Sequence, residues 1–514
     1  MISTNLTPSS SYARLYLMGV IFRRVIKPIL FKFDPEYVHD KITVFGAFLG
    51  SFSLTRKLTH FLFSYSNRCL SQTVFGIKFS NPIGLSAGFD KNAQLVNILP
   101  SVGFGFAEVG TVTARAYEGN PRPRLFRLPK SQGIVVNYGL KNIGADRVME
   151  RVKARKDKSI PQIISIGKTN SPDTVELNNG IVDYENCLDQ VIASEQGDIY
   201  EINISCPNAF GGEPFTTPEK LEALLTRLFA KNIPRPVLLK MPINVAWPEF
   251  EKLLAVAVRH GVAGVVIGNV NKDRNDPAVS DVIPEHIKGS ISGLPTKHLA
   301  NELIAKTYKS YGDRLKIVGV GGIFSAEDAY EKIKLGASLV ELITGMIFKG
   351  PSLIGDINRE LVKYLERDGY NSVADTIGTG KPKKVLVFGV FDELHEGHKF
   401  FLSDTRKHGE LVIAVARDSV VRKIKNKAPI HHEFKRAEAL RQFLPDAIVV
   451  LGDETQGGYE VVKSCKPDII CLGYDQKKLG DDLRQKMRDG ILPQIPIKEL
   501  KAHKPEQYKS NLIA

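Results

Sequence analysis

Two short segments of this chain carry side chains whose types and spacing could do chemistry. Residues 203–208 have the sequence Asn-Ile-Ser-Cys-Pro-Asn, and the thiolate of Cys206 could take a proton from carbon while a hydride leaves for the N5 atom of a flavin. Residues 395–398 have the sequence His-Glu-Gly-His, and the imidazoles of His395 and His398 at the start of a helix could stabilise charge on an α-phosphate as pyrophosphate leaves. We therefore predict two enzymes fused in tandem.

Both segments also have plainer interpretations. A lone cysteine is ordinarily a small buried hydrophobe, and a short histidine motif is often a surface feature without a role. Two histidines three residues apart can bind zinc, but the rest of the C-terminal region offers no matching pair of Cys and His, so we predict no metal centre there. The residues around each motif favour the catalytic interpretation.

The composition limits the class of protein. With 514 residues, 43% of them hydrophobic and 25% charged, the chain is expected to fold into two or three soluble domains. Its net charge is +14, yet the basic residues are dispersed without an aromatic-interleaved stripe, so we predict anionic small substrates and acidic lipid surfaces and no nucleic acid. Five cysteines without C-x-x-C spacing argue against a disulfide framework and predict a cytoplasmic protein.

The N-terminal segment, residues 1–70, is the only membrane candidate. Between Arg14 and Phe33, apolar residues are interrupted by four basic ones, which excludes a spanning helix and favours a helix lying in the membrane interface. The segment holds nine Lys or Arg against three Asp or Glu, which would attract anionic lipid. We expect a protein peripheral to the inner face of the cell membrane; the alternative is a helical extension packed on the next domain.

From residue 71 onward, short apolar runs alternate with amphipathic stretches such as 218–230 and 326–335. Repeated strand-helix units over this length predict an α/β fold, a (β/α)8 TIM barrel at residues 71–367 that follows the N-terminal helical extension. The predicted strands are 103–109, 162–166, 198–203, 236–240, 262–267, 315–319 and 338–342. The polar or glycine residues at the carboxyl ends of these runs, the face that carries barrel active sites, are Thr111, Lys168, Asn203, Lys240, Asn269, Gly321 and Thr344.

Two glycine clusters, residues 319–322 and 344–345, follow the last two predicted strands. Because glycine lets backbone amides approach a phosphate closely, the two clusters together predict a phosphate-bearing cofactor. Lys240 could place positive charge near the N1–C2 edge of a reduced flavin. Amides that can both donate to and accept from a planar, imide-containing ring are those of Asn203, Asn208 and Asn269.

Residues 31 to about 365 resemble dihydroorotate dehydrogenase, the FMN enzyme of pyrimidine synthesis. The matching motifs occur in the order of that family and cover residues 33–36 with His39, 81–92, 108–113, 119–124 and 203–208. The resemblance implies that the barrel oxidises dihydroorotate to orotate. It implies FMN contacts from Ala87, Gly88, Thr111, Lys240, Gly293, Gly322 and Thr344, and the glycine clusters add Gly321 and Gly345. It implies orotate contacts from Lys91, Asn203, Asn208 and Asn269.

The N-terminal extension and the Asp-Pro-Glu sequence at 34–36 look like the membrane-associated, quinone-reducing class of that family. We therefore expect a quinone as the electron acceptor. Cys206 departs from this class, which usually has serine as its base. The alternatives are a different electron acceptor and a different dihydropyrimidine substrate.

Three further positions depart from the family's pattern. Residues 136–142 are an altered version of the substrate loop, in which Asn137 or Asn142 would face orotate. Ser165 stands where an FMN-contacting asparagine is usual. Val270 stands where a substrate-contacting threonine is usual.

A second domain follows the barrel. Residues 368–383 contain glycines, lysines and a proline with little periodicity and are expected to be a linker. A fresh alternation then predicts a doubly wound, Rossmann-like domain at residues 384–514. Its predicted strands are 385–388, 411–415, 447–451 and 469–472, and its predicted helices are 397–407, 434–443 and 459–464.

The context of the histidine motif, Gly-x-Phe-Asp-x-x-His-x-Gly-His, resembles the cytidylyltransferase-like superfamily. Within it, Leu-Gly-Tyr-Asp-Gln at 472–476 looks most like the archaeal-type FAD synthases, which join FMN to ATP. This similarity implies that His395 and His398 act on the phosphates, with Mg²⁺ neutralising the departing pyrophosphate of ATP or CTP. It implies a nucleotide pocket with Phe391, Asp392 and Asp475, and a triphosphate held by Lys423 and Arg436.

We expect a bifunctional flavin-linked enzyme that serves de novo pyrimidine biosynthesis and also moves a nucleotide onto a phosphorylated acceptor such as FMN. FAD synthesis would use ATP and FMN, whereas a lipid-head-group transferase would prefer CTP. A noncatalytic flavin-sensing module is the third possibility for the second domain.

Overall fold

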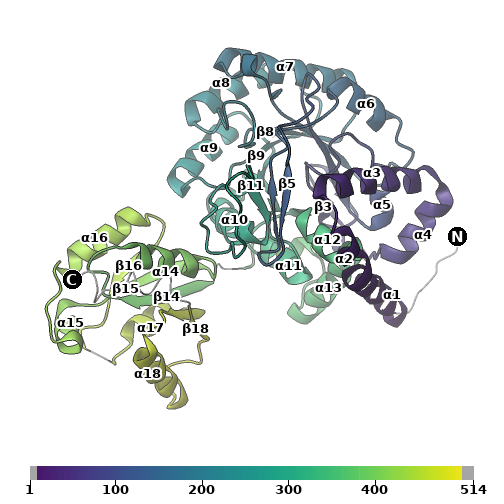
Figure 1. Ribbon diagram of the computed structural model, residues 1–514. Coiled ribbons are helices and arrows are strands. Elements are labelled where there is room, and N and C mark those ends of the chain that lie inside the picture. The colour runs from purple at the N-terminus through teal and green to yellow at the C-terminus, as the bar shows by residue number, and fades with distance from the viewer. Residues whose placement is uncertain (1–7, 381–382, 456, 501–514) are drawn as a thin grey trace. The chain divides into compact units, whose positions relative to one another are not determined.

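The computed structural model describes residues 8–380, 383–455 and 457–500 (Figure 1). The predicted N-terminal extension and the predicted second domain each include residues outside these ranges. The chain forms two compact units, the first ending at Lys381 and the second beginning at Pro382. Each unit has its own sheet and its own hydrophobic core.

The first unit is built around a closed barrel of eight parallel strands, which confirms the predicted TIM-barrel fold. In order around the barrel the strands are β10 (Gly264–Ile267), β12 (Lys316–Val320), β13 (Leu339–Leu342), β3 (Ile83–Leu85), β4 (Phe106–Val112), β7 (Gln162–Ile166), β8 (Ile199–Asn203) and β9 (Val237–Lys240). The three-residue strand β3 is too short to give a sequence signal. The predicted run 103–109 starts too early, because Gly103 ends the short helix α5 (Leu99–Val102) in a left-handed conformation.

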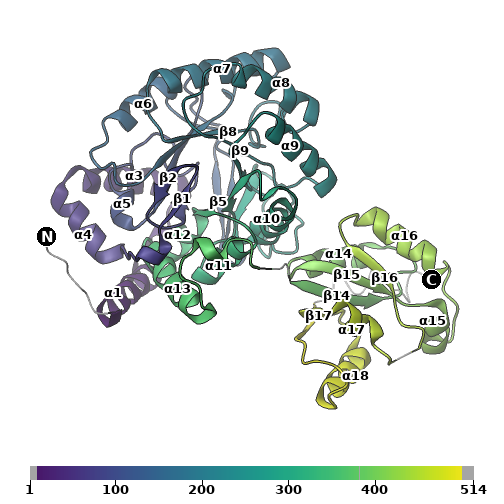
Figure 2. The same cartoon turned by 180° about the vertical axis from the view of Figure 1, so that it is seen from behind.

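Amphipathic helices cover the outside of the barrel, as Figures 1 and 2 show. The helix α8 (Pro218–Phe229) illustrates the cause, because it buries leucines at 221, 224, 225 and 228, the spacing of one helix face. The predicted helices 218–230 and 326–335 correspond to α8 and α11. The other covering helices are α6 (Ala145–Lys153), α7 (Leu177–Ala193), α9 (Trp247–Arg259), α10 (Lys297–Tyr311), α11 (Ala326–Lys334), α12 (Thr344–Lys349) and α13 (Ser352–Asp368).

Side chains inside the barrel form two layers of opposite character. The lower layer is apolar and consists of Phe106, Ile163, Ile199, Leu238, Val266, Val318 and Leu339. The layer above it, two residues further along the strands, is polar and contains Glu108, Ser165, Glu201, Lys240 and Glu341, all buried. Residues two apart on a strand point to the same face, so both layers face the barrel axis. The barrel therefore carries a buried charged layer below its carboxyl mouth.

Two small sheets flank the barrel and have no counterpart in the sequence predictions. One is the hairpin of β1 (Gln72–Val74) and β2 (Ile77–Phe79). The other is an antiparallel sheet of β11 (Ser290–Gly293), β6 (Gly133–Val136) and β5 (Leu125–Leu128). The second sheet matters for the site, because the altered substrate loop begins at the end of β6.

The N-terminal extension is helical and packs on the barrel unit. The helix α1 (Pro8–Ile21) contacts α4 (Ser53–Phe63) and α13 and buries Leu15 completely. The helix α3 begins after Asp34, whose carboxylate accepts a hydrogen bond from the backbone N–H of Tyr37 at 2.8 Å. The elements are α1 (Pro8–Ile21), the π-helical segment η1 (Phe22–Ile26), α2 (Lys27–Leu30), α3 (Pro35–Ser51) and α4 (Ser53–Phe63).

The same extension also leaves a large apolar surface open, which we call the α3–α4 apolar face. Its exposed side chains are Ile42, Val44, Phe45, Phe48, Phe52, Leu54, Leu58 and Phe61. Within the described part of the chain, every helix is too short or too polar to cross a bilayer. An apolar surface of this kind marks a contact site.

The segment that follows α13 packs against the barrel unit as far as residue 380. Val373 is fully buried, and its backbone N–H donates to the carbonyl of Cys69 at 2.8 Å. The N–H of Gly380 donates to the carbonyl of Lys334 at 2.7 Å. The expected linker at 368–383 therefore differs from the structure, where contacts with the barrel unit extend well past residue 368.

The second unit is a five-stranded parallel sheet with hydrophobic clusters on both faces, which confirms the doubly wound prediction. The strands run in the order β16 (Ile448–Leu451), β15 (Glu410–Val415), β14 (Lys384–Gly389), β17 (Ile469–Leu472) and β18 (Ile497–Glu499). The helices are α14 (Glu396–Arg406), α15 (Asp418–Lys425), α16 (Glu433–Phe443), α17 (Glu460–Cys465) and α18 (Lys477–Arg488). The histidine motif thus opens α14, directly after the central strand β14.

Candidate active sites

The carboxyl mouth of the barrel brings together polar residues that are far apart in the sequence. Asn203, the last residue of β8, donates through Nδ2 to the hydroxyl of Thr111 at 2.8 Å. The hydroxyl of Thr111 lies 2.8 Å from that of Ser165 in β7. Ser165 donates to the carboxylate of Glu201 at 2.6 Å. A hydrogen-bonded path therefore runs from the mouth into the charged layer.

Lys240, at the end of β9, is buried rather than solvated. Its Nζ atom lies 3.2 Å from the carboxylate of Glu108 and 3.4 Å from both the carboxylate of Glu201 and the hydroxyl of Ser86. Burial by itself lowers the pKa of Lys240, but the neighbouring carboxylates raise that pKa well above its ordinary value. The side chain is therefore a fixed cation at the base of the mouth.

Cys206 follows β8 in a loop that asparagines hold from two sides. Asn269 donates through Nδ2 to the carbonyl and the hydroxyl of Ser205, both at 2.8 Å. The side-chain oxygen of Asn203 accepts from the backbone N–H of Ser205 at 3.2 Å. Desolvation raises the pKa of the Cys206 thiol to about 11, although the nearby Lys168 acts in the opposite direction. The residue as a whole keeps part of its surface exposed.

The structure separates the two asparagines of the altered substrate loop. Asn137 accepts a hydrogen bond from Nδ2 of Asn120 at 3.0 Å, and Asn120 also donates to the carbonyl of Asn208 at 2.8 Å. Asn142 instead donates to the hydroxyl of Thr113 at 2.7 Å. Asn137 thus belongs to one cluster with Asn208, whereas Asn142 stabilises the loop itself.

Lys91 is buried against one residue of the helix α3 and one residue of the substrate loop. Its Nζ atom lies 3.4 Å from Nε2 of His39 in α3 and 3.9 Å from the ring centroid of Tyr138. Burial lowers the pKa of Lys91 to about 7. Lys91 is consequently a cation whose charge depends on pH near neutrality.

Glu36 fastens α3 to the loops around the mouth. This buried carboxylate lies 2.9 Å from Arg124, 3.2 Å from Arg122 and 3.3 Å from Lys141. Three cations from two different loops therefore converge on one residue of the N-terminal extension.

Glycine turns lie where the phosphate-bearing cofactor is predicted. Gly321 and Gly322 follow β12 with φ angles of 104° and 70°, a left-handed region that glycine adopts without strain. Gly293 ends β11, and a Cβ atom at that position would collide with the side chain of Thr344. Thr344 and Gly345 form the first turn of α12. Backbone segments after β11, β12 and β13 thus meet on one side of the mouth.

The loop after β3 carries the remaining predicted cofactor residues. The backbone N–H of Ala87 donates to the carboxylate of Glu108 at 2.7 Å. Gly88 has a φ of 106°, and its N–H donates to the carbonyl of Gly110 at 2.8 Å. A Cβ atom at Gly88 would meet only Ile343, at 3.9 Å, so this side of the turn leaves room for a ligand.

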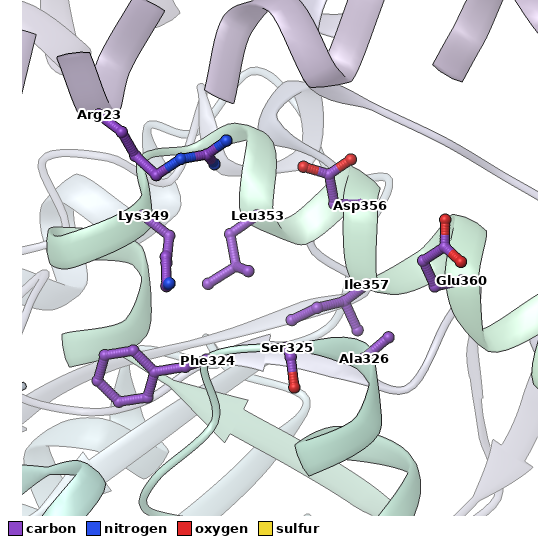
Figure 3. Close-up of a pocket in the computed structure, with 9 residues that line it drawn as sticks. All are labelled: Arg23, Phe324, Ser325, Ala326, Lys349, Leu353, Asp356, Ile357 and Glu360. Carbon is purple, nitrogen blue, oxygen red and sulfur yellow. The ribbon is translucent and has the colours of Figure 1, made fainter. Parts of the chain in front are cut away.

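A separate pocket of about 240 Å³ lies beside η1, α12 and α13 (Figure 3). Its lining includes two cations, Arg23 and Lys349, and two carboxylates, Asp356 and Glu360. The described lining consists of residues other than those predicted to bind cofactor or substrate. This pocket is therefore distinct from the barrel mouth.

In the second unit, the two histidines of the motif stack on each other at the start of α14. Their ring centroids are 3.8 Å apart, and Nδ1 of His395 accepts from the backbone N–H of His398 at 3.3 Å. The ring of Phe391 lies edge-on to His398, with centroids 5.3 Å apart. Burial lowers the pKa of His395. Two imidazoles thus sit where backbone N–H groups of a helix end are also available to an anion.

The other predicted nucleotide residues lie in different environments. Asp392 accepts hydrogen bonds from the backbone N–H groups of Ile430 at 2.7 Å and His431 at 2.8 Å, so it orders that loop. Asp475 is exposed. Next to it, Gln476 donates to the carbonyl of Phe388 at 2.8 Å and fixes the 472–476 segment to the end of β14.

Arg436, which is predicted to hold the triphosphate, lies inside the fold. Its guanidinium is fully buried and donates to the carbonyls of Val390, His431 and Ala416 and to the carboxylate of Asp418. It therefore holds loops together from inside. Lys423, the other predicted triphosphate residue, is exposed on α15.

Five residues in or below the barrel mouth were not identified as site residues from the sequence: Asn120 and Tyr138 at the mouth, and Glu108, Glu201 and Glu341 in the charged layer. A signal was present for the three glutamates, because each is a charged residue inside a mostly apolar predicted strand. Such residues are buried only when they have partners.

Comparisons with known proteins agree with this arrangement. Residues 69–365 match the family described as Dihydroorotate dehydrogenase, and residues 386–496 match the family described as Cytidylyltransferase-like. A protein named Dihydroorotate dehydrogenase (quinone) from Acaryochloris marina is 34% identical over 376 residues, which cover 70% of this chain and 99% of the relative. The protein of the same name from Gloeobacter violaceus is 36% identical over 356 residues, which cover 69% of this chain and 98% of the relative.

A solved structure of a dihydroorotate dehydrogenase is also similar to this chain. The crystal structure of DHODH from Eimeria tenella in complex with ferulenol superimposes with a TM-score of 0.59 at 27% identity, covering 68% of this chain and 98% of that one. The matches to the barrel cover nearly the full length of these relatives. The chain therefore belongs to the dihydroorotate dehydrogenase family, and a cytidylyltransferase-like domain follows its barrel.

Proposed function

We propose that the barrel oxidises dihydroorotate to orotate with bound FMN and that Cys206 removes the proton from C5 of the substrate. Membership of the family and the shared name of the relatives support the reaction. The observation that carries the site assignment is the loop of Cys206, which Asn203 and Asn269 hold at the end of β8, where Asn203 pairs with the buried cation Lys240 of β9. A base, two amides and a cation are what carbon-acid oxidation beside a flavin requires.

The residues at the mouth fit FMN. Bound FMN would supply the hydride acceptor. Lys240 would face its electron-rich N1–C2 edge, and Thr111 and Asn203 offer a hydroxyl and an amide to the ring. The turns at Gly321 and Thr344 would offer backbone N–H groups to the phosphate.

The substrate's polar edges have matching groups around Cys206. Asn137, Asn208 and Asn269 would bind the imide, whose N–H donates and whose carbonyls accept. Lys91 would hold the carboxylate of dihydroorotate. The asparagine cluster would thereby fix the C5 hydrogen close to the Cys206 sulfur, which is the main requirement for general-base catalysis.

Anaerobic mixing of the FMN-loaded protein with dihydroorotate tests this proposal. Dihydroorotate should bleach the flavin absorbance, and Cys206→Ala should nearly abolish the bleaching while Cys206→Ser retains part of it. Bleaching by another dihydropyrimidine but not by dihydroorotate would reassign the substrate.

We further propose that electrons leave to a quinone and that the α3–α4 apolar face lies on the inner surface of the cell membrane. The exposed side chains of Phe48, Phe52 and Leu58 support the membrane contact, and the relatives' name, Dihydroorotate dehydrogenase (quinone), supports the acceptor. The double variant Phe48→Ser/Leu58→Ser should cosediment less with vesicles of anionic phospholipid than the parent protein. Cosedimentation equal to that of the parent would contradict the membrane proposal.

For the second unit we propose transfer of AMP from ATP to FMN. The stacked pair His395 and His398 at the start of α14 supports nucleotidyl transfer, because the helix end and the imidazoles can stabilise charge on an α-phosphate. The sequence at 472–476 favours FMN as the acceptor. Mg²⁺ would neutralise the leaving pyrophosphate.

The full chain, incubated with Mg²⁺, FMN and either ATP or CTP, separates the possible activities. ATP should give FAD and pyrophosphate, and His398→Ala should remove both products without changing dihydroorotate oxidation. Pyrophosphate release with CTP alone would identify a cytidylyltransferase. Flavin binding without pyrophosphate from either nucleotide, unchanged in His398→Ala, would identify a noncatalytic module.

A further inference from the structure

The charged layer of the barrel holds more carboxyl groups than its single cation can balance. Glu108, Glu201 and Glu341 are all fully buried and share one ammonium group, that of Lys240. Burying two uncompensated negative charges in a protein interior is very unfavourable, so buried carboxylates of this kind take up protons. At least one of the three carboxyl groups therefore carries a proton in the folded protein.

The hydrogen bonds identify the carboxyl groups that can hold it. One oxygen of Glu108, one oxygen of Glu201 and both oxygens of Glu341 are buried without a hydrogen bond. The other oxygen of Glu108 accepts from the backbone N–H of Ala87 at 2.7 Å and from the ammonium group of Lys240 at 3.2 Å, two donors that favour a charged carboxylate. Burial and the charge of Glu108 raise the pKa of Glu201 to about 8 and raise the pKa of Glu341 well above its ordinary range.

A row of hydroxyl groups joins Glu201 to the mouth. Ser165 donates to Glu201 at 2.6 Å, and its oxygen lies 2.8 Å from that of Thr111, which accepts from Asn203 at 2.8 Å. A hydroxyl can donate and accept at the same time and can therefore pass a proton along. The hydroxyl of Ser165 therefore links Thr111 to Glu201.

We propose that Glu201 and Glu341 form a proton store below the flavin position, which binds one proton when two electrons enter the flavin and releases it when they leave. This inference rests on the proposed use of FMN. The negative charge that arrives next to Lys240 raises the affinity of the pair for a proton, which enters from solvent by way of Thr111 and Ser165. When the electrons pass to a quinone, the stored proton leaves by the same row of hydroxyls and becomes one of the two protons in the quinol.

The charges around Glu201 and Glu341 set the pH range in which this pair can take up a proton on reduction of the flavin. The titratable groups that face Glu201 and Glu341, besides each other, are Glu108 and Lys240; the hydroxyl of Ser165 faces Glu201 and that of Ser86 faces Glu341. Below a pH of about 8 the pair is already protonated before reduction and takes up nothing further. Above that pH, reduction should draw in a proton. The midpoint potential of the flavin should therefore fall more steeply with pH there, by about 30 mV per unit for one additional proton in a two-electron reaction.

Proton uptake can be measured directly with a pH-indicator dye in weakly buffered solution. The FMN-loaded full chain is reduced by dihydroorotate at a pH one unit above the Glu201 pKa of about 8. The parent protein and Glu249→Gln, a control at an exposed position, should take up one more proton per two electrons than Glu201→Gln or Glu341→Gln. Ser165→Ala should reach the uptake of the parent protein more slowly. Equal uptake in the parent protein and both glutamine variants would overturn the proposal.

Infrared spectroscopy of the flavin-free protein gives a second measurement that needs no catalysis. The carbonyl stretch of a protonated, buried carboxyl group should be present near neutral pH, disappear as the pH rises past about 8, and be weaker in Glu201→Gln. Its absence from the parent protein would also overturn the proposal. A protein that binds no FMN, or whose flavin dihydroorotate leaves oxidised, would instead refute the proposed function.

Discussion

The Nε2 atom of His39 lies 3.4 Å from the Nζ atom of Lys91. The helix α3 of the N-terminal extension therefore contacts the lysine that would hold the substrate. His39 also lies 2.9 Å from the carbonyl of Phe89 through the same nitrogen. Burial, with the nearby charge of Lys91, lowers the pKa of His39. The extension would thereby form part of the wall of the proposed active site.

The binding of orotate should depend on the protonation of Lys91. Burial lowers the pKa of this lysine to about 7, so its charge is present below that pH and lost above it. Orotate affinity should therefore fall as the pH rises above 7, by up to about tenfold per unit. Titration of the FMN-loaded protein with orotate checks this. Lys91→Met should bind weakly at every pH, whereas the exposed control Lys153→Met should retain the dependence.

The rate of flavin reduction should depend on Cys206 and on pH. Desolvation raises the pKa of its thiol to about 11, so the thiolate fraction and the rate should increase with pH through the neutral and alkaline range. Loss of a general base typically costs about 10²- to 10⁴-fold, which is expected for Cys206→Ala. Stopped-flow absorbance under anaerobic conditions measures both effects. A rate in Cys206→Ala that equals the parent rate would rule out this base.

Removal of the buried carboxylate at Glu36 should loosen the N-terminal extension. Glu36→Gln leaves Arg124 and its neighbours without their counter-charge, and breaking such a buried pair costs about 3 kcal/mol. The matched change Arg122→Gln removes only the most exposed partner and should cost less than about 1 kcal/mol. Urea unfolding of the barrel unit, followed by circular dichroism, distinguishes the two. An equal loss of stability in the two variants would mean that Glu36 does not anchor α3 to the loops around the mouth.

The stability of the barrel should decrease with pH because of Glu201. A carboxyl group whose pKa is raised in the folded state contributes its full stabilisation below its ordinary pKa of 4.5 and loses it as the pH rises to about 8. Between these values the free energy of unfolding should fall by up to about 1.4 kcal/mol per pH unit. Denaturant midpoints measured across this range should show a smaller decline for Glu201→Gln than for the parent.

The second unit offers a matched pair of cations. Arg436→Gln should destabilise this unit by more than about 2 kcal/mol, because three carbonyls and Asp418 lose a buried donor. Lys423→Gln, at an exposed position, should leave stability unchanged and weaken nucleotide binding. Thermal unfolding and ATP titration of both variants test this. A stable Arg436→Gln protein that failed to bind ATP would restore the original prediction for Arg436.

The sequence allowed prediction of the elements whose signal is local. The strands β7, β8 and β13 lie within predicted runs, because each run is a short, mostly apolar segment between turn signals. The strand β3 and the flanking sheet of β5, β6 and β11 have no such signal. Their residues become strands because partners distant in sequence supply the hydrogen bonds.

For the site, residue type alone pointed to Cys206 and to the histidine motif, because few other side chains can do their chemistry at that spacing. It could not separate Asn137 from Asn142. That separation depends on Asn120, which reaches Asn137 and Asn208 from another loop. Arg436 was assigned to a phosphate for its charge, but packing decided that this charge faces carbonyls inside the fold.

The amino-acid order by itself determined that the chain holds a barrel followed by a doubly wound sheet and that each carries its own reactive motif, because periodicity and motif spacing are properties of neighbouring residues. Only the tertiary structure decided that Glu108, Glu201 and Glu341 share the charge of Lys240. These residues lie on four different strands, and closure of the barrel alone brings their side chains to one level of its interior.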